Sequence, residues 1–170
     1  TSFLISCLVI LILLPLFFHS IESSYLVSTL TRIVIFAIAA VSLDLLIGFT
    51  GLVSFGHAAF LGVGAYTVGI LSFHAYEETT FLGFSGTLSG LVTMPLAVFL
   101  SAFVALIIGA LSLRTKGVYF IMITLSFGQM LFFLFVSLEQ YGGDDGMMMF
   151  DGRNTLPMLN LNDRVEFYYF

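Results

Sequence analysis

The sequence predicts an all-α, polytopic bundle of transmembrane helices, with about five spans and the start of a sixth. Its 170 residues are 59% hydrophobic and only 9% charged, against roughly 25% charged residues in an average soluble domain. A soluble domain of this length leaves about a third of its surface in water, and this composition cannot cover such a surface with polar side chains. The apolar residues also gather in runs close to the roughly 20 residues that span a bilayer.

Five apolar runs follow one another along the chain, separated by polar or glycine-rich connections. They cover residues 3–18, 27–48, 57–73, 91–113 and 118–138. The first run is not preceded by the basic residues that open a signal peptide, so we expect a spanning helix there. A further run begins at Val165 and stops after a few residues, and the chain does not start with Met. We therefore expect one transmembrane domain over residues 1–170, incomplete at its C-terminus and part of a longer protein.

Basic residues predict which helix ends face the cytoplasm. The connection LRTKG contains Arg114 and Lys116 and no acid, and Lys and Arg near helix ends favour the cytoplasmic side. The connections at 74–90 and 139–164 are acidic, and we place them outside, which puts the N-terminus inside. Arg32, near the outer end of the second run, does not follow this rule.

The stretch GFTGLVSFGHAAFLGVGAYTVG, residues 48–69, holds six of the chain's 16 glycines. Glycine disfavours helix, so the first part of the stretch predicts a helix break. The residues assigned to this break are Gly48, Gly51, Ser54, Gly56 and His57. Ser54 and His57, together with Thr50, have side chains that can satisfy the backbone groups freed by a break, which lipid cannot do.

Two interpretations of the break stay open. Non-helical backbone at membrane depth persists only inside protein or beside a water-filled cavity, and in transporters such interruptions indicate the substrate path. The alternative is a plain cytoplasmic turn between two helices, with glycine as a helix C-cap.

Small residues on two of the predicted helices indicate close helix–helix contacts, as membrane helices use to bring backbones together. On the third run they are Ala58, Gly62, Ala65 and Gly69, at i, i+4, i+7 and i+11. On the fifth run they are Thr124 and Gly128, beside a polar stripe that includes Ser126 and Gln129. This stripe either lines a path or hydrogen-bonds to a neighbouring helix.

Three acids are further candidates for function. Asp44 lies inside the second run, where a carboxylate is a functional hypothesis by default, although its place one turn before Gly48 also suits a hydrated interface. Asp144 and Asp145 lie in the long outer connection without the spacing of a calcium loop. They are either solvated turn residues or part of a docking surface.

The sequence contains no motif for catalysis, for a bound cofactor or for nucleic acid. The phosphate-binding pattern G-x-x-x-x-G-K-[ST] is absent, so we do not expect the chain to hydrolyse ATP. No Cys/His cluster suggests a metal site, and no basic patch suggests nucleic acid.

Three blocks of sequence resemble the permease subunits of branched-chain amino-acid ABC importers, of the LivM type. They are SLDLLIGFTGLVSFGHAAFLGVGAY, LRTKGVYFIMITLSFGQM and YGGDDGM, in that family's order and spacing. Where many members have a glutamine after the second glycine of the first block, this chain has Leu52, so no role of that side chain is carried over. The family's further helices and its cytoplasmic coupling loop are not among these 170 residues.

The resemblance implies the N-terminal part of a permease in the bacterial inner membrane, translocating branched-chain, aliphatic amino acids. The implied partners are a second homologous permease, two ATPase subunits that bind the ATP, and an extracytoplasmic binding protein that docks at Asp144 and Asp145. Two alternatives stay open. One is an ABC permease for urea or short amides, and the other is a secondary transporter or channel for small polar solutes.

Overall fold

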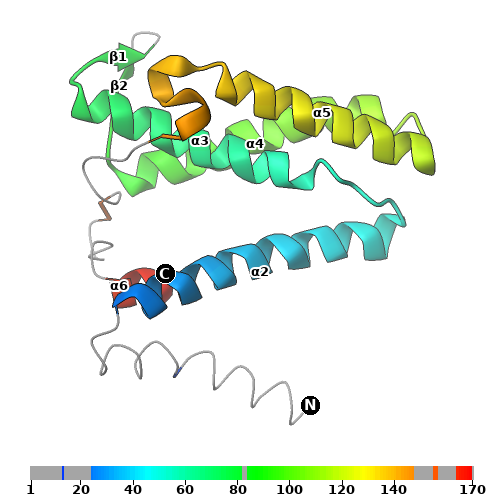
Figure 1. The fold of residues 1–170 in the computed structure, drawn as a ribbon, viewed down its shortest axis with the longest axis horizontal. Coiled ribbons are helices and arrows are strands. Elements are labelled where there is room, and N and C mark those ends of the chain that lie inside the picture. Colours follow the sequence, from blue (N-terminus) through cyan, green and yellow to red (C-terminus); the bar gives the residue numbers. More distant parts are fainter. Residues whose placement is uncertain (1–12, 14–23, 82–83, 148–154, 157–163, 170) are drawn as a thin grey trace. The chain divides into compact units, whose positions relative to one another are not determined.

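Four long helices dominate the computed structural model, which describes residues 13, 24–81, 84–147, 155–156 and 164–169. They are α2 (Ser24–Thr50), α3 (His57–Tyr76), α4 (Gly90–Ser112) and α5 (Val118–Val136), shown in Figure 1. Each is long and apolar enough to cross a membrane. At 1.5 Å per residue, α5 is about 28 Å long and α2 about 40 Å, against roughly 30 Å of bilayer hydrocarbon.

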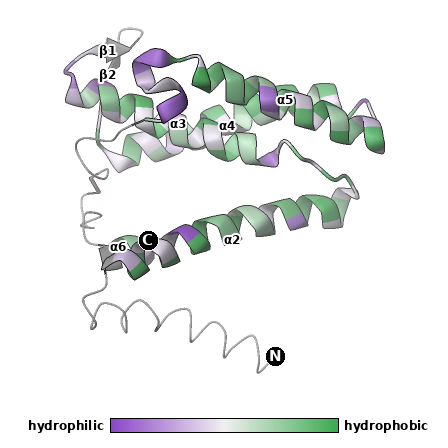
Figure 2. Cartoon of the chain, viewed as in Figure 1, coloured by the Kyte–Doolittle hydropathy of each residue, from purple (hydrophilic) through white to green (hydrophobic). Residues whose placement is uncertain are grey.

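The predicted all-α, polytopic fold is confirmed. Each long helix matches one predicted run, and hydrophilic residues gather mainly at the helix ends and in the connections (Figure 2). The predicted run at 3–18 lies outside the described residues apart from Leu13, which is helical. A short helix, α6 (Arg164–Tyr169), occupies the predicted start of a further span. The described strands are two-residue elements, β1 (Thr80–Phe81) and β2 (Phe84–Ser85), paired antiparallel between α3 and α4.

The chain divides into two compact units, one of residues 1–38 with 155–170 and the other of residues 39–154. In the first unit, Val27 and Thr31 are buried and the Thr31 hydroxyl donates a hydrogen bond to the Val27 carbonyl. The second unit contains α3, α4 and α5 with their connections. That all 170 residues form a single domain stays a prediction.

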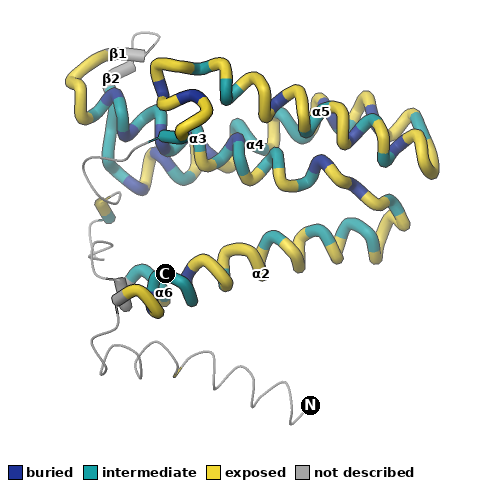
Figure 3. Tube along the Cα trace, in the orientation of Figure 1, coloured by how far each residue is buried: buried dark blue, intermediate teal, exposed yellow. Residues whose placement is uncertain are grey.

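The apolar core of the second unit lies among α3, α4 and α5, and each helix contributes one buried apolar residue to it, namely Val63, Ile108 and Leu131. Between α3 and α4 the contact is close, because the Ser101 hydroxyl donates a hydrogen bond of 3.1 Å to the carbonyl of Phe60. Exposed residues recur along all four long helices (Figure 3), and many of them are large and apolar, such as Phe99, Leu106 and Phe133. Exposed apolar residues of this kind suit a surrounding of lipid.

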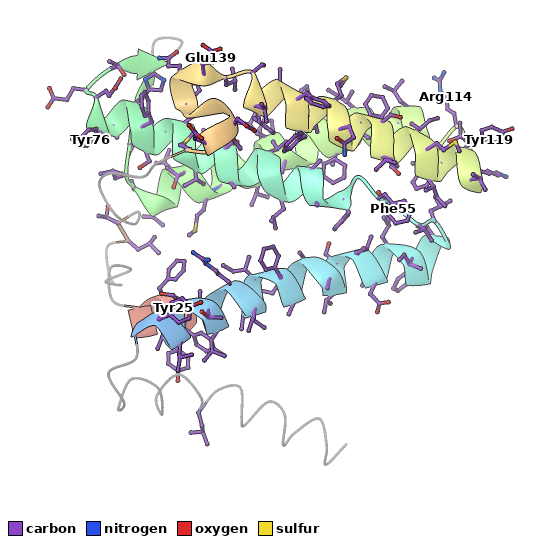
Figure 4. All side chains as sticks on the ribbon, viewed as in Figure 1. Tyr25, Phe55, Tyr76, Arg114, Tyr119 and Glu139 are labelled. Atoms are coloured by element: carbon purple, nitrogen blue, oxygen red, sulfur yellow. The ribbon has the colours of Figure 1, made fainter. Side chains whose placement is uncertain are left out.

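The acidic connections of the second unit and its basic turn lie at opposite ends of the helices (Figure 4). Figure 4 shows Tyr76 and Glu139 at one end of the α3–α5 group and Arg114 and Tyr119 at the other. Helices α3 and α5 therefore finish at the same end, where the acidic connections begin. Which end faces the cytoplasm stays a prediction from the basic turn.

Candidate functional site

The break between α2 and α3 covers residues 51–56. Helix α2 ends at Thr50, and Gly51 follows with φ +65° and donates its N–H to the Ile47 carbonyl at 2.8 Å. This is the usual role of glycine just after a helix C-terminus. The Thr50 hydroxyl donates to the Leu46 carbonyl at 2.7 Å and accepts from the Leu52 N–H at 3.3 Å. Thr50 therefore satisfies one backbone group of the break, the Leu52 N–H, while its own hydroxyl hydrogen bonds back into α2.

Three residues assigned to the break behave differently from the prediction. Gly48 lies in the last turn of α2 and adopts no positive φ, so the break begins three residues later. Among the described residues, the hydrogen-bond partner of the His57 ring is a side chain and not the backbone of the break: its Nε2 lies 3.1 Å from the hydroxyl oxygen of Ser42 on α2. Ser54 is buried, and its side chain makes no hydrogen bond to the described residues.

At Gly56 the backbone of the break packs directly against the backbone of α5. It is buried, and a Cβ added there would collide with the carbonyl oxygen of Thr124. A Cβ added at Gly128 would lie 3.3 Å from the Cα of Gly56. The small-residue pair of α5 thus packs against glycine backbone, which brings two helices together without side chains between them.

A pocket of about 330 Å³ lies beside this contact, between α3 and α5. Its volume falls in the roughly 300–1,000 Å³ range of small-molecule sites. Phe55, Leu125 and Phe132 give it apolar walls, and Gln129 adds one amide side chain. The rings of two further lining residues, Tyr66 and Phe135, stack with their centroids 4.2 Å apart. The pocket therefore combines apolar walls with two polar side-chain groups, the Gln129 amide and the Tyr66 hydroxyl.

The predicted path residues do not all meet at this pocket. Gly56 and Gln129 line it. Asp44 and Gly48 line a separate hollow on α2, together with Val41, Leu45 and Phe49. Gly51 is exposed, and Ser126 is exposed and donates a hydrogen bond of 2.8 Å to Met122 in its own helix rather than to a neighbouring helix.

The small face predicted on α3 is only partly covered. Ala58 and Gly62 line the pocket, and a Cβ added at Gly62 would have nothing within 4 Å. Ala65 is exposed, whereas Gly69 is buried against the Met147 side chain. Within the described part of the chain, the close helix contact of α3 with α4 is made instead at Gly64, where a Cβ would lie 3.1 Å from the Ser101 hydroxyl oxygen. A helix contact at Gly62 stays a prediction.

The block YGGDDGM forms a compact pair of turns, η1 (Glu139–Tyr141) and η2 (Gly143–Asp145). Its glycines, Gly142, Gly143 and Gly146, have φ of +96°, +50° and +83°, which glycine adopts without steric penalty. Asp144 and Asp145 are exposed, whereas Tyr141 is buried. Desolvation by burial, with a smaller effect of the Glu77 charge, raises the pKa of the Tyr141 phenol above its ordinary value.

Among the described residues, no three His, Cys, Asp or Glu side chains lie close enough together to hold a metal ion. Sequence reasoning did not single out His74, whose ring joins the end of α3 to Tyr141, 67 residues later. No pattern in the sequence signals that pairing, because periodicity within a helix identifies a face and not its distant partner.

The arrangement of the break, the pocket and the turns η1 and η2 can be compared with known families. The family described as "Branched-chain amino acid transport system / permease component" matches residues 25–155. This chain belongs to that permease family. It is similar to the high-affinity branched-chain amino acid transport system permease protein LivM of Salmonella typhimurium (strain LT2), with 33% identity over 146 residues. It is also similar to the LivM protein of Escherichia coli (strain K12), with 31% identity over 146 residues.

Each of these alignments covers 85% of this chain and 31% of the relative, so the chain spans about a third of the length of the curated permeases it matches. No solved structure matches it. Family membership and the four membrane-length helices identify the chain as a multi-pass membrane protein of a transport family.

Proposed function

We propose that this chain is part of the membrane-spanning permease subunit of an ABC importer and helps to translocate branched-chain, aliphatic amino acids. The pocket between α3 and α5 carries the proposal. Its walls of Phe55, Leu125 and Phe132 suit an apolar side chain, while Gln129 and the non-helical backbone next to Gly56 offer hydrogen bonds to polar groups. Apolar walls with a few placed polar groups are typical of small-molecule sites.

The proposal includes the partners of such an importer. They are a second homologous permease subunit, two ATPase subunits and an extracytoplasmic substrate-binding protein, assembled in the bacterial inner membrane. The matched relatives, named as permease proteins of branched-chain amino acid transport systems, support this assignment. Because the chain has no phosphate-binding loop, ATP binds to the ATPase subunits, and the permease itself needs no cofactor.

The geometry supports a transport step by alternating access. The binding protein delivers substrate at the outer end, where Asp144 and Asp145 are exposed. ATP binding closes the ATPase subunits, and the bundle reorients around the path. At the contact of Gly56 with α5 no side chain lies between the two backbones, so a small shift of either helix changes the pocket beside it directly.

Uptake into proteoliposomes tests the function. The full-length permease, assembled with its partner subunits, is supplied with ATP inside and binding protein outside. We expect leucine uptake that requires both ATP and the binding protein. Isoleucine and valine should inhibit this uptake, whereas urea should not. Gly56→Val should abolish uptake in an assembled complex, whereas Gly109→Val, in an open position of α4, should not. Uptake driven by an ion gradient without ATP would show a secondary transporter, and inhibition by urea or short amides would change the substrate class.

A further inference from the structure

The last turn of α3 joins two connections that are far apart in the sequence. His74 is 5% exposed, and its Nε2 lies 2.8 Å from the hydroxyl oxygen of Tyr141 in the outer segment 139–147. Its Nδ1 lies 2.6 Å from the hydroxyl oxygen of Thr79. A neutral imidazole has one donor and one acceptor nitrogen, and each hydroxyl group can either donate or accept. Both tautomers of the ring therefore satisfy both contacts.

The turn after α3 holds Thr79 in place. Glu78 has φ +53°, a left-handed conformation that is unfavourable for residues other than glycine. The Thr79 N–H donates to the His74 carbonyl at 3.1 Å, and the Glu77 N–H donates to the Phe73 carbonyl at 3.0 Å. The strained residue turns the chain back on the helix and places the Thr79 hydroxyl against the His74 ring.

Two further contacts strengthen this end of α3. The ring of Phe73 meets the ring of Tyr141 edge to face, with centroids 5.4 Å apart. The Met147 side chain packs against buried Gly69. Since Gly69 and His74 are five residues apart, the segment 139–147 is attached to α3 at two points separated by about 7.5 Å along the helix.

We propose that His74 is a positioning residue that fixes the outer segment 139–147 to α3. Asp144 and Asp145 are exposed on that segment, while the first half of α3 lines the pocket through Gly62 and Tyr66. A protein that docks on the segment therefore acts on α3 through the hydrogen bond between His74 and Tyr141. This coupling rests on the proposed importer function, whereas the attachment of the segment does not.

The phenol of Tyr141 is neutral at physiological pH, as an ordinary tyrosine with a pKa of about 10 is, and burial raises the pKa of this phenol further above that value. Its hydroxyl group thus remains able to donate to, or accept from, the His74 ring throughout the neutral range.

Tyr141→Phe tests the proposal, because it removes only the hydroxyl group and leaves the buried ring. The first readout is hydrogen–deuterium exchange of residues 138–147 in the full-length, assembled complex. We expect exchange about fivefold faster, the change that the typical net contribution of one hydrogen bond produces. Tyr119→Phe is the matched control, since Tyr119 is an exposed tyrosine at the opposite end of the α3–α5 group. Exchange unchanged by Tyr141→Phe would overturn the positioning role.

The second readout is uptake measured against the concentration of binding protein. We expect Tyr141→Phe and His74→Phe to raise the concentration that gives half-maximal uptake several-fold, with little change in the rate at saturation. His74→Gln, whose amide can still bond to Tyr141, should restore part of the difference. Faster exchange with an unchanged half-maximal concentration would overturn the coupling. If the wild-type complex does not take up amino acids at all, the importer function fails, and the exchange result still decides the positioning role.

Discussion

A single methyl group at Gly56 should destabilise the contact between the break, just before α3, and α5. A Cβ there would collide with the Thr124 carbonyl oxygen and lie 3.0 Å from its carbonyl carbon, and both atoms belong to backbone rather than to a flexible side chain. One of the two helices therefore has to move. Overpacking of this kind typically costs about 1–3 kcal/mol, so we expect Gly56→Ala to lower the free energy of unfolding by that amount.

Gly62→Ala is the control with the opposite expectation. Gly62 lies in the same helix that follows the break, but a Cβ there has nothing within 4 Å. Replacing a helical glycine by alanine gains up to about 1 kcal/mol from helix propensity. Reversible unfolding of the full-length permease in detergent, followed by circular dichroism, measures both variants. A Gly56→Ala protein as stable as wild type, or a shift of both variants in the same direction, would refute the backbone contact.

Three further predictions follow from the same geometry. Glu78→Gly should raise the free energy of unfolding by about 1 kcal/mol, because glycine adopts positive φ without penalty; an unchanged or lower value would show that Glu78 is not strained. Single cysteines are introduced at positions 115 and 145 in a background without the native cysteine. A membrane-impermeant reagent should reach position 115 only from the cytoplasm and position 145 only from outside; the reverse pattern would invert the orientation. Gly62→Leu should lower uptake by filling the pocket, and normal uptake by an assembled complex would exclude Gly62 from both the path and a helix contact.

The helices were largely predictable because their signal is local. Apolar length predicts the start of α3 at His57 and of α5 at Val118, as observed. The ends are less predictable. Helix α3 continues to Tyr76 because the turn at Glu78 closes its last turn. In α2, Gly48 looks like a breaker in the sequence, yet it needs no positive φ, and the chain leaves the helix at Gly51 instead.

For the candidate site, the sequence predicted which helix faces carry small residues, but not which parts of the chain pack against them. The sequence identifies Thr124 and Gly128 as a smooth surface of α5, but it does not show that Gly56 is the group that packs there. On α3 the sequence indicates the face of Gly62, whereas the described contact with α4 uses Gly64 and Ser101. A glycine pattern shows where a backbone can approach, and only the path of the chain in three dimensions determines which backbone does.

Substrate protection of cysteines in the pocket is the most direct test of the path. Phe55→Cys and Ala58→Cys place thiols at lining positions, and Val53→Cys places one in the same break, exposed but outside the pocket. The assembled transporter is treated with a small water-soluble thiol reagent, with and without leucine and binding protein. We predict that substrate slows the reaction at positions 55 and 58 several-fold and leaves position 53 unchanged. Equal rates with and without substrate at both lining positions would contradict the assignment of the pocket to the substrate path.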